Sequence, residues 1–288
     1  MESMTGLLVE GGGMKCAYSA GVLDAFLDAG LTKFDYSMGV SAGAANLVSY
    51  LGGQRDRNRR FYVEHVTDPK YISLKNYLRT GNYFGLQYIY GDMTEEGGMD
   101  PADYEKYMAT PTKLFFPATD GETGVPHYFS KDDLGPHNYK AIMATCALPV
   151  IAKPIEINGH KYFDGGVSVS IPVQKMVQDG CDKIVAILSK PRGFVMEPQG
   201  HRKAYTVLLK KQYPKIVEKL DNRHNEYNKE MKNLLRLEKE GKAFLFTPSG
   251  SIEMSTYTKD PEKNQKLYDE GLRHGREAME KLREFLSK

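Results

Sequence analysis

A short apolar run that ends in glycines opens the chain. Residues 7–9 are apolar, residues 11–13 are all glycine, and apolar residues then recur at helical spacing over 14–29. A short, wholly apolar run bounded by glycine is typical of a strand buried in a parallel sheet. A second strand is predicted over 34–40, and a small, apolar, helix-compatible segment follows at 42–51. This β-α-β-α order predicts a parallel sheet covered by helices.

The remaining sequence continues this alternation after one interruption. Segment 54–110 contains several arginines, many tyrosines and few periodic runs, so we expect helical pieces and loops that form a cap or lobe. An Asn158-Gly159 pair predicts a hairpin turn. The other predicted strands lie at 112–120, 125–130, on both sides of that turn within 153–163, at 182–189 and at 243–247. The other predicted helices lie at 138–146, 171–179, 202–240 and 261–286.

Composition excludes several classes of protein. A formal net charge of +2 over 288 residues gives no case for nucleic-acid binding. The three scattered cysteines support neither a disulfide framework nor a zinc ribbon, and indicate reduced thiols in a cytoplasmic protein. No apolar run approaches about 18 residues, and residues 1–10 lack the pattern of a signal peptide. Any membrane contact is therefore expected to be peripheral.

A serine stands at the predicted turn between the second strand and the second helix. The sequence there is Gly39-Val40-Ser41-Ala42-Gly43. A G-x-S-x-G turn holds a serine hydroxyl at a sharp corner, where bulky residues at the glycine positions would clash. The following helix directs its N–H groups and positive dipole end toward the same place. The alternative is a plain strand-to-helix turn in which Ser41 only caps the helix.

The glycine run predicts an oxyanion-binding loop. Successive glycines allow backbone N–H groups to approach a ligand closely, and a helix begins directly after them. Two nucleotide-binding motifs fail here, because Cys16 stands at the third glycine of G-x-G-x-x-G and Lys15 lacks the neighbours of a Walker loop. The predicted oxyanion segment comprises Gly11, Gly12, Gly13, Met14 and Lys15.

A serine nucleophile needs a base that removes its proton. None of the seven histidines lies in a recognisable triad motif. Asp164 opens an Asp164-Gly165-Gly166 tripeptide at the end of a predicted strand. Such a tripeptide alone is most often a turn, and its significance increases because the other two motifs precede it.

The three motifs, in this order, resemble those of the patatin-like phospholipases, particularly the bacterial members. That family combines a glycine-rich oxyanion element followed by Lys or Arg, a G-x-S-x-G nucleophile and a D-G-G/A base motif. Segment 144–149, Ala-Thr-Cys-Ala-Leu-Pro, also resembles the family's small-residue and proline segment. The resemblance covers about residues 6–190. One departure is Cys16, which stands where the family usually has glycine.

The resemblance implies a three-layer α/β/α patatin-like fold with a mainly parallel central sheet and a helical lobe. It implies a catalytic domain over 6–190, with the cap or lobe at 54–110. Residues 191–288 would then form a helical C-terminal extension packed on that domain.

The resemblance also implies a chemistry. Ser41 and Asp164 would form a dyad without histidine, and the loop 11–15 would stabilise the oxyanion, with no cofactor and no metal. The implied activity is hydrolysis of lipid acyl esters through an acyl-Ser41 intermediate, as in phospholipases A and lysophospholipases. The substrate would be a phospholipid or another acyl ester. Two alternatives stay open: a Ser-His acyltransferase or α/β-hydrolase-type esterase, and a non-catalytic lipid-binding regulator.

A basic, amphipathic segment at 202–219 bears on membrane contact. Apolar residues alternate there with lysines, a pattern found in helices that lie on anionic lipid. The same pattern fits a helix docked on the domain with a solvated basic face. The apolar residues of this segment are Tyr205, Leu208, Leu209, Tyr213, Ile216 and Val217.

Nothing in the sequence indicates the oligomeric state.

Overall fold

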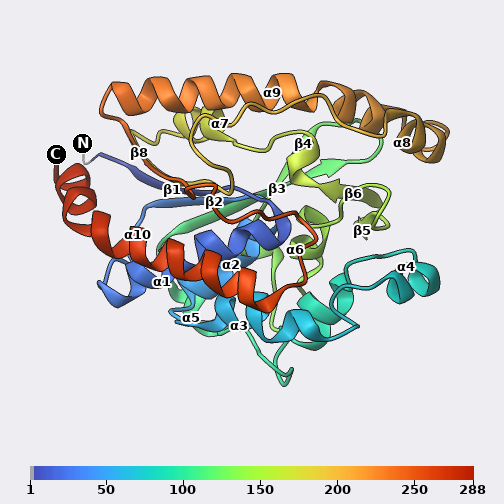
Figure 1. Ribbon diagram of the computed structural model, residues 1–288, viewed down its shortest axis with the longest axis horizontal. Coiled ribbons are helices and arrows are strands. Elements are labelled where there is room, and N and C mark those ends of the chain that lie inside the picture. The colour runs from blue at the N-terminus through green and yellow to red at the C-terminus, as the bar shows by residue number, and fades with distance from the viewer. Residues whose placement is uncertain (1–2) are drawn as a thin grey trace.

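A computed structural model describes residues 3–288, and among these residues eight strands form a single sheet (Figure 1). The strand order is β5-β6-β3-β2-β1-β7-β8, and β4 pairs with β3. The pairs β1–β2, β1–β7, β2–β3 and β7–β8 are parallel. The strands are β1 (Thr5–Val9), β2 (Tyr36–Gly39), β3 (Lys113–Asp120), β4 (Pro126–Ser130), β5 (Ile155–Ile157), β6 (His160–Asp164), β7 (Lys183–Ile187) and β8 (Ala243–Phe246).

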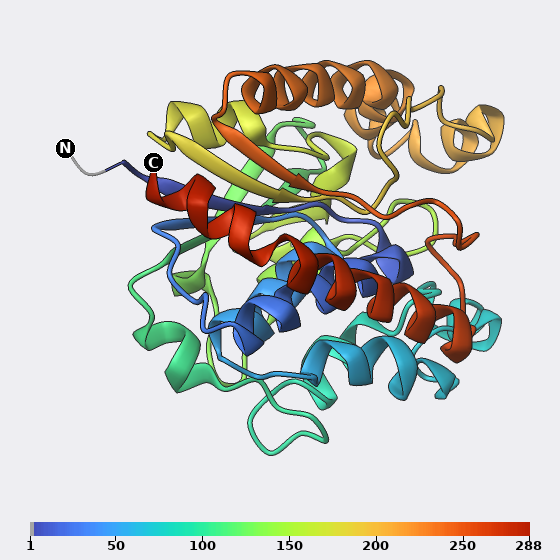
Figure 2. The ribbon, with the colours of Figure 1, turned by 60° about the vertical axis from the view of Figure 1, so that its left-hand side comes forward.

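Helices cover both faces of this sheet, which confirms the predicted three-layer α/β/α architecture. Helices α7 and α9 lie over one face, and α1, α2 and α10 lie over the other (Figures 1 and 2). The helices are α1 (Ala17–Asp28), α2 (Ala42–Leu51), α3 (Arg57–Val63), α4 (Leu74–Thr80), α5 (Tyr104–Ala109), α6 (Lys140–Thr145), α7 (Val173–Gln178), α8 (Arg202–Leu209), α9 (Pro214–Lys239) and α10 (Pro261–Ser287).

The apolar run at the start of the chain serves both layers. Successive side chains of a strand point to opposite faces, so a strand between two helical layers must be apolar throughout. Leu7 and Val9 belong to the core under α1, α2 and α10. Leu8 belongs to the core under α7 and α9. All three side chains are fully buried.

Segment 54–110 contains the predicted helical pieces, namely α3, α4 and α5 with short turns between them. The buried Arg57 links this segment to α2, because its guanidinium donates to Ser49 Oγ (2.8 Å) and to the Asp100 carbonyl (2.7 Å). Its division from the main body as a cap or lobe stays a prediction.

The residues after 190 share the central sheet. Strand β8 pairs in parallel with β7, and the two long helices on either side of β8 cover opposite faces. The apolar stripe predicted in the last helix packs on the core, and Leu267 and Leu282 are buried there. The domain boundary near residue 190 stays a prediction.

Two strands share one edge of β3. β2 pairs in parallel with Lys113–Phe115, and β6 pairs antiparallel with Ala118–Asp120. β4 pairs with β3 at Phe115 and at Ala118, so it occupies the opposite edge at both places. The carboxyl ends of β2 and β6 therefore point toward each other across the gap beside Pro117. Proline suits this gap because it has no N–H to leave unpaired.

Helices α1 and α10 approach each other closely through glycines. A Cβ added to Gly271 would lie against the Tyr18 carbonyl oxygen, well inside van der Waals contact, and one added to Gly21 would meet the Tyr268 carbonyl oxygen in the same way. Each glycine thus admits the backbone of the opposite helix. The close fit holds α10 against the layer that supports the nucleophile turn.

This packing reverses the usual preference of helices for alanine. In an exposed helix, Gly→Ala stabilises by about 1 kcal/mol. We expect Gly271→Ala to lower the free energy of unfolding by about 1–3 kcal/mol, because the added methyl must separate the helices. Urea unfolding measures the change, with Gly200→Ala as the control, since a Cβ there meets no atom within 4 Å. A Gly271→Ala protein as stable as the wild type would contradict the close packing.

Candidate active site

Ser41 follows β2 directly and adopts an unusual backbone conformation. Its φ of 53° and ψ of −129° lie outside the regions that serine normally occupies. It stands at the N-terminal boundary of α2, yet its side chain makes no capping hydrogen bond. The interpretation of Ser41 as a simple helix cap therefore lacks its defining contact, and the hydroxyl stays free for another role.

Thr145 supports this strained turn from the end of α6. The Ser41 N–H donates to Thr145 Oγ1 at 3.0 Å, and the Thr145 hydroxyl donates to the Pro117 carbonyl at 2.5 Å. Thr145 is fully buried. It thus connects the nucleophile turn to the gap in β3, and it fixes the backbone where a strained conformation costs energy.

Asp164 ends β6 on the other side of the same gap. Its N–H donates to the Ala147 carbonyl (2.9 Å), and its carbonyl accepts the Thr119 hydroxyl (2.9 Å). Its Oδ1 accepts the Gly166 N–H at 2.8 Å. Its Oδ2 is buried and has no hydrogen-bond partner within residues 3–288. The carboxylate therefore has one oxygen held in place and one available.

Burial raises the pKa of Asp164 to about 6. The nearby Ser41 hydroxyl, the Gly166 N–H and Arg223 each lower this pKa and offset part of the burial effect. Ser41 lies close to the carboxylate without making a hydrogen bond of full geometric quality, as is common in catalytic sites without substrate. A carboxylate with a pKa near 6 is mostly ionised at neutral pH and still basic enough to accept a proton.

The glycine loop faces Ser41. A Cβ on Gly11 would lie 2.6 Å from the Val40 carbonyl oxygen and 2.9 Å from Ser41 Cβ, so only glycine permits this approach. The Met14 N–H donates to the Thr256 carbonyl, and the Lys15 N–H donates to the Gly12 carbonyl. Within the described part of the chain, the N–H groups of Gly11, Gly12 and Gly13 have no acceptor. The predicted oxyanion segment thus separates into three available donors and two that the fold engages.

A buried ion pair anchors this loop to the end of β7. The Glu10 carboxylate pairs with Lys190 and accepts the Ser189 N–H at 2.8 Å. The Ser189 hydroxyl donates to the Gly11 carbonyl at 2.7 Å. Cys16, the departure from the family pattern, is fully buried and its thiol contacts the Glu10 carbonyl at 3.4 Å. Burial raises the pKa of this thiol, so it stays protonated and unreactive.

A pocket of about 370 Å³ opens over Ser41 and Asp164. Glycines of the oxyanion loop, the 148–151 segment, α8 and α9 all contribute to its walls. Its cationic side chains are Lys15, Lys190 and Arg223. Burial and the nearby Lys190 lower the pKa of Lys15. The pocket therefore offers positive charge next to the predicted nucleophile.

The histidines lie mostly away from this pocket. His201 is the one histidine among its lining residues in the described chain. His160 sits in the β5–β6 hairpin, is exposed, and contacts Asp120 Oδ2 at 3.2 Å. Asp164 and the Cys146 thiol are the titratable groups close to Ser41, and the role of Asp164 as the base stays a prediction.

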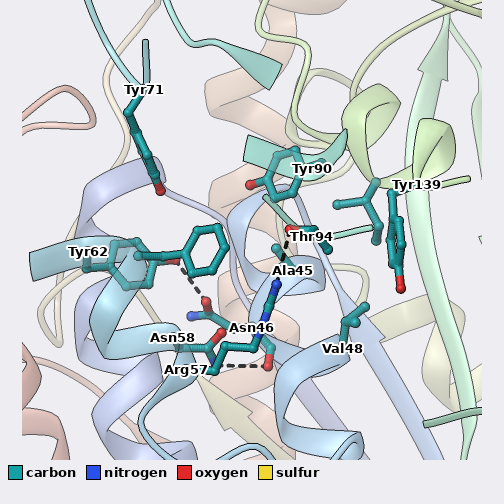
Figure 3. A pocket seen from close by; sticks show the side chains of 12 residues that line it. Ala45, Asn46, Val48, Arg57, Asn58, Tyr62, Tyr71, Tyr90, Thr94 and Tyr139 are labelled. Carbon is teal, nitrogen blue, oxygen red and sulfur yellow. Dashed lines mark hydrogen bonds between the residues drawn. The ribbon is translucent and has the colours of Figure 1, made fainter. Parts of the chain in front are cut away.

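Two smaller cavities lie inside the protein, and Ser41 lines one of them. The first, of about 40 Å³, is lined by Ser41, Gly13 and mostly apolar or aromatic residues, including Phe84 and Leu86. The second, of about 30 Å³, is shown in Figure 3 and shares Tyr62, Tyr71 and Tyr90 with the first. In Figure 3 the hydroxyls of Tyr71 and Tyr90 point toward the interior of this space. The first cavity therefore extends the apolar side of the site inward from Ser41, whereas polar residues such as Arg57 and Asn46 line part of the second.

Two features are absent from residues 3–288. Nowhere in them do three or more His, Cys, Asp or Glu side chains gather as ligands for a metal ion. No helix of this part of the chain combines the length and the apolar character needed to cross a membrane.

Comparison with known proteins agrees with this geometry. A family model described as patatin-like phospholipase matches residues 7–177, and the chain belongs to this family. Membership supports lipid acyl hydrolysis as the general class of activity. A second family model, a domain of unknown function (DUF6363), matches residues 213–287.

Individual relatives are distant. The chain is 27% identical over 195 residues to "Uncharacterized protein YjjU" of Escherichia coli (strain K12). This match covers 67% of the chain and 54% of YjjU, so the chain spans about half the length of this relative. The crystal structure of VipD from Legionella pneumophila is similar over 99% of this chain and 67% of that chain, with a TM-score of 0.45 and 14% identity.

Four supporting residues escaped the motif-based predictions. Thr145 lies in a segment recognised only by its small residues, and its hydroxyl is the one feature there that pointed to a polar role. Lys190, Arg223 and Thr256 have no local motif, because each reaches the site from an element far along the chain.

The bridge through Thr145 is testable. Thr145→Val preserves shape but leaves the Ser41 N–H and the Pro117 carbonyl buried and unpaired. We expect it to lower the free energy of unfolding by about 1–3 kcal/mol in urea titrations. Thr145→Ser keeps the hydroxyl and is the matched control. Equal stability of the Val and Ser variants would show that the bridge does not hold the turn.

Proposed function

We propose that this protein is a lipid acyl hydrolase of the phospholipase A or lysophospholipase kind, working through a Ser41–Asp164 dyad. The observation that carries the proposal is the meeting of two strand ends on one edge of β3. It brings the Ser41 hydroxyl, which makes no helix-capping hydrogen bond, close to the buried Asp164 carboxylate, whose Oδ2 has no hydrogen-bond partner in the described chain. A nucleophile and a base in such an arrangement suit acyl transfer.

The proposed reaction has two steps, acylation of Ser41 and hydrolysis of the acyl-Ser41 intermediate. Asp164 accepts the Ser41 proton as Ser41 Oγ attacks the ester carbonyl. The N–H groups of the glycine loop stabilise the oxyanion, where one such donor is worth roughly 3–4 kcal/mol in comparable sites. The proton passes from Asp164 to the departing alcohol, and an acyl-Ser41 remains. Water then gives a proton to Asp164 and attacks the acyl group. Asp164 returns that proton to Ser41 Oγ as the Ser41–acyl bond breaks, and the fatty acid leaves.

The two sides of Ser41 suggest where each half of the substrate lies. The small, mostly apolar cavity lined by Ser41, Phe84 and Leu86 indicates the side of Ser41 on which the acyl chain would begin. The larger, cationic pocket is open enough for the alcohol portion.

Two alternative functions can be distinguished from the proposed dyad by experiment. A Ser-His enzyme would depend on a histidine, and His201 is the candidate because it lines the pocket. A non-catalytic lipid-binding protein would leave Ser41 unreactive, so a fluorophosphonate probe, which labels activated serines, would not react with it.

The dyad predicts a specific pattern of losses. Incubated with a mixed lipid extract, the wild-type protein should release fatty acids and lysolipids that mass spectrometry identifies. Ser41→Ala should release none above background, and Asp164→Asn should lose about 10²- to 10⁴-fold in rate. No single histidine substitution should approach the Asp164 effect. Undiminished turnover by a folded Ser41→Ala protein, verified by circular dichroism, would refute the dyad.

A peripheral lipid contact also fits the structure. Tyr205, Leu209, Ile216 and Val217 of the basic segment are buried, so most of its apolar residues dock on the protein. Val207 and Leu208 of α8 remain 81% and 60% exposed. Exposed lysines accompany them, as in helices that bind anionic membranes. These lysines are Lys203, Lys210 and Lys211.

A second exposed apolar pair lies nearby on α4. Leu74 and Leu78 are 64% and 79% exposed, and α4 and α8 both lie at the right of Figure 1. The Tyr77 hydroxyl of α4 donates to the Val150 carbonyl (3.1 Å), and Val150 packs against the buried cluster that contains Tyr205 and Leu209 of α8. Val150 also lines the pocket over Ser41, so it connects α4 to the wall of that pocket.

Vesicle binding tests this surface. The wild-type protein should co-sediment at low salt with vesicles containing anionic lipid, and less so with purely zwitterionic ones. The double variant Val207→Glu, Leu208→Glu should lose most of the binding, because it replaces the two exposed apolar side chains of α8 with negative charges. Val177→Glu on α7, also at an exposed valine, is the control. Failure of the wild type to bind at low salt would reject the surface.

A further inference from the structure

One cation in the pocket comes from the C-terminal segment 213–287, which a separate family model matches. Arg223 lies in α9, within the 213–287 segment of unknown function, and it lines the pocket that contains Ser41 and Asp164. Its Nε donates to the Gly166 carbonyl at 2.6 Å. The C-terminal region therefore contacts the turn that carries the predicted base.

Gly166 brings this guanidinium close to the carboxylate. A Cβ on Gly166 would lie 3.1 Å from Asp164 Oδ1 and 3.4 Å from Arg223 Nη2. A side chain at this position would fill the space between the two groups. The second glycine of the Asp-Gly-Gly motif thus leaves Asp164 and Arg223 facing the same region of the pocket.

The two terminal nitrogens of the Arg223 guanidinium, Nη1 and Nη2, are available to donate hydrogen bonds to a ligand. In residues 3–288, neither Nη1 nor Nη2 has a hydrogen-bond acceptor, and no carboxylate lies within the 4 Å of an ion pair. The pocket's other carboxylate, that of Glu10, is occupied by Lys190 and the Ser189 N–H. A guanidinium presents planar, paired donors that match phosphate and carboxylate oxygens.

We propose that Arg223 binds an anionic group, of phosphate type, on the alcohol portion of the substrate while its Nε positions the Gly166 carbonyl. The inference rests on the proposed function and narrows it to acyl esters whose leaving alcohol is negatively charged. With the acyl chain placed on the side of the small apolar cavity beside Ser41, the anion lies on the α9 side of Ser41. Residues 213–287 then supply substrate specificity to the patatin-like region.

The neighbourhood of Asp164 provides a second readout. The charged and titratable groups that face it are Arg223, the Cys146 thiol and the Tyr257 hydroxyl, beside the Ser41 hydroxyl. Burial raises the pKa of Cys146 to about 12 and also raises that of Tyr257, so both stay neutral near pH 6. Arg223 lowers the pKa of Asp164, and its removal raises that pKa. Activity needs the ionised base, so its acidic limb moves to higher pH without Arg223.

Two soluble substrates with the same acyl chain separate recognition from catalysis. Monohexanoylglycerol 3-phosphate is anionic and monohexanoylglycerol is neutral, and kcat/KM is measured for both across pH. Arg223→Gln should lower the anionic-to-neutral ratio of kcat/KM by about ten- to a hundredfold. Arg223→Lys should retain part of the ratio, because it keeps the charge. Arg236→Gln, which removes a charge from an exposed site on the same helix, should match the wild type.

The outcomes distinguish this inference from the proposed function. An unchanged ratio in Arg223→Gln, or an equal loss on both substrates with an unshifted acidic limb, overturns the role of Arg223. A wild-type protein inactive on both esters and unreactive toward the fluorophosphonate probe overturns the proposed hydrolase itself. A reduced ratio together with a shifted limb supports both roles of Arg223.

Discussion

The candidate site depends on the way β2 and β6 share one edge of β3. Strand pairing determines where each strand ends, and these two end opposite Phe115 and Ala118 with Pro117 between them. The chain must leave the sheet on both sides of this gap, so Ser41 and Asp164 emerge together. The Thr145 hydroxyl lies in this gap, where it accepts the Ser41 N–H and donates to the Pro117 carbonyl. The geometry of the candidate site thus follows from the hydrogen-bond register of the strands more than from side-chain packing.

The local sequence predicts many of the strands, helices and turns around the site. It does not predict the contacts between residues that are far apart in the chain. The strand over residues 5–9 and the helices around Ser41 are predictable, because burial on both faces and helical spacing leave a periodic record in the chain. Gly39 marks the sharp turn for a local steric reason, because a Cβ there would meet the Ala44 backbone. A Cβ on Gly43 would instead meet the Val9 carbonyl oxygen of β1, a contact that local sequence does not show. The partnership of Ser41 with Thr145 joins residues 104 positions apart, and no periodicity records it. The same holds for Glu10 and Lys190, whose pairing exists only once β1 and β7 are adjacent.

The environment of Asp164 illustrates a balance of opposing effects. Full burial raises its pKa, whereas a backbone N–H, a hydroxyl and a guanidinium lower it, and the result lies near 6. A more exposed carboxylate would be a weaker base, and a fully unpaired one would stay protonated at neutral pH. The fold achieves this balance by engaging Oδ1 and leaving Oδ2 unpaired.

The C-terminal residues contribute to the same site from both faces of the sheet. Arg223 reaches the base turn from α9, and the Thr256 carbonyl, just before α10, engages the Met14 N–H in the oxyanion loop. Because the Met14 and Lys15 N–H groups are engaged, the free donors of that loop in the described chain are the three glycine N–H groups, and Gly11 lies against Ser41. Strand β8 connects these two contacts through the central sheet. Residues after 190 thus contact both the Asp164 turn and the glycine loop.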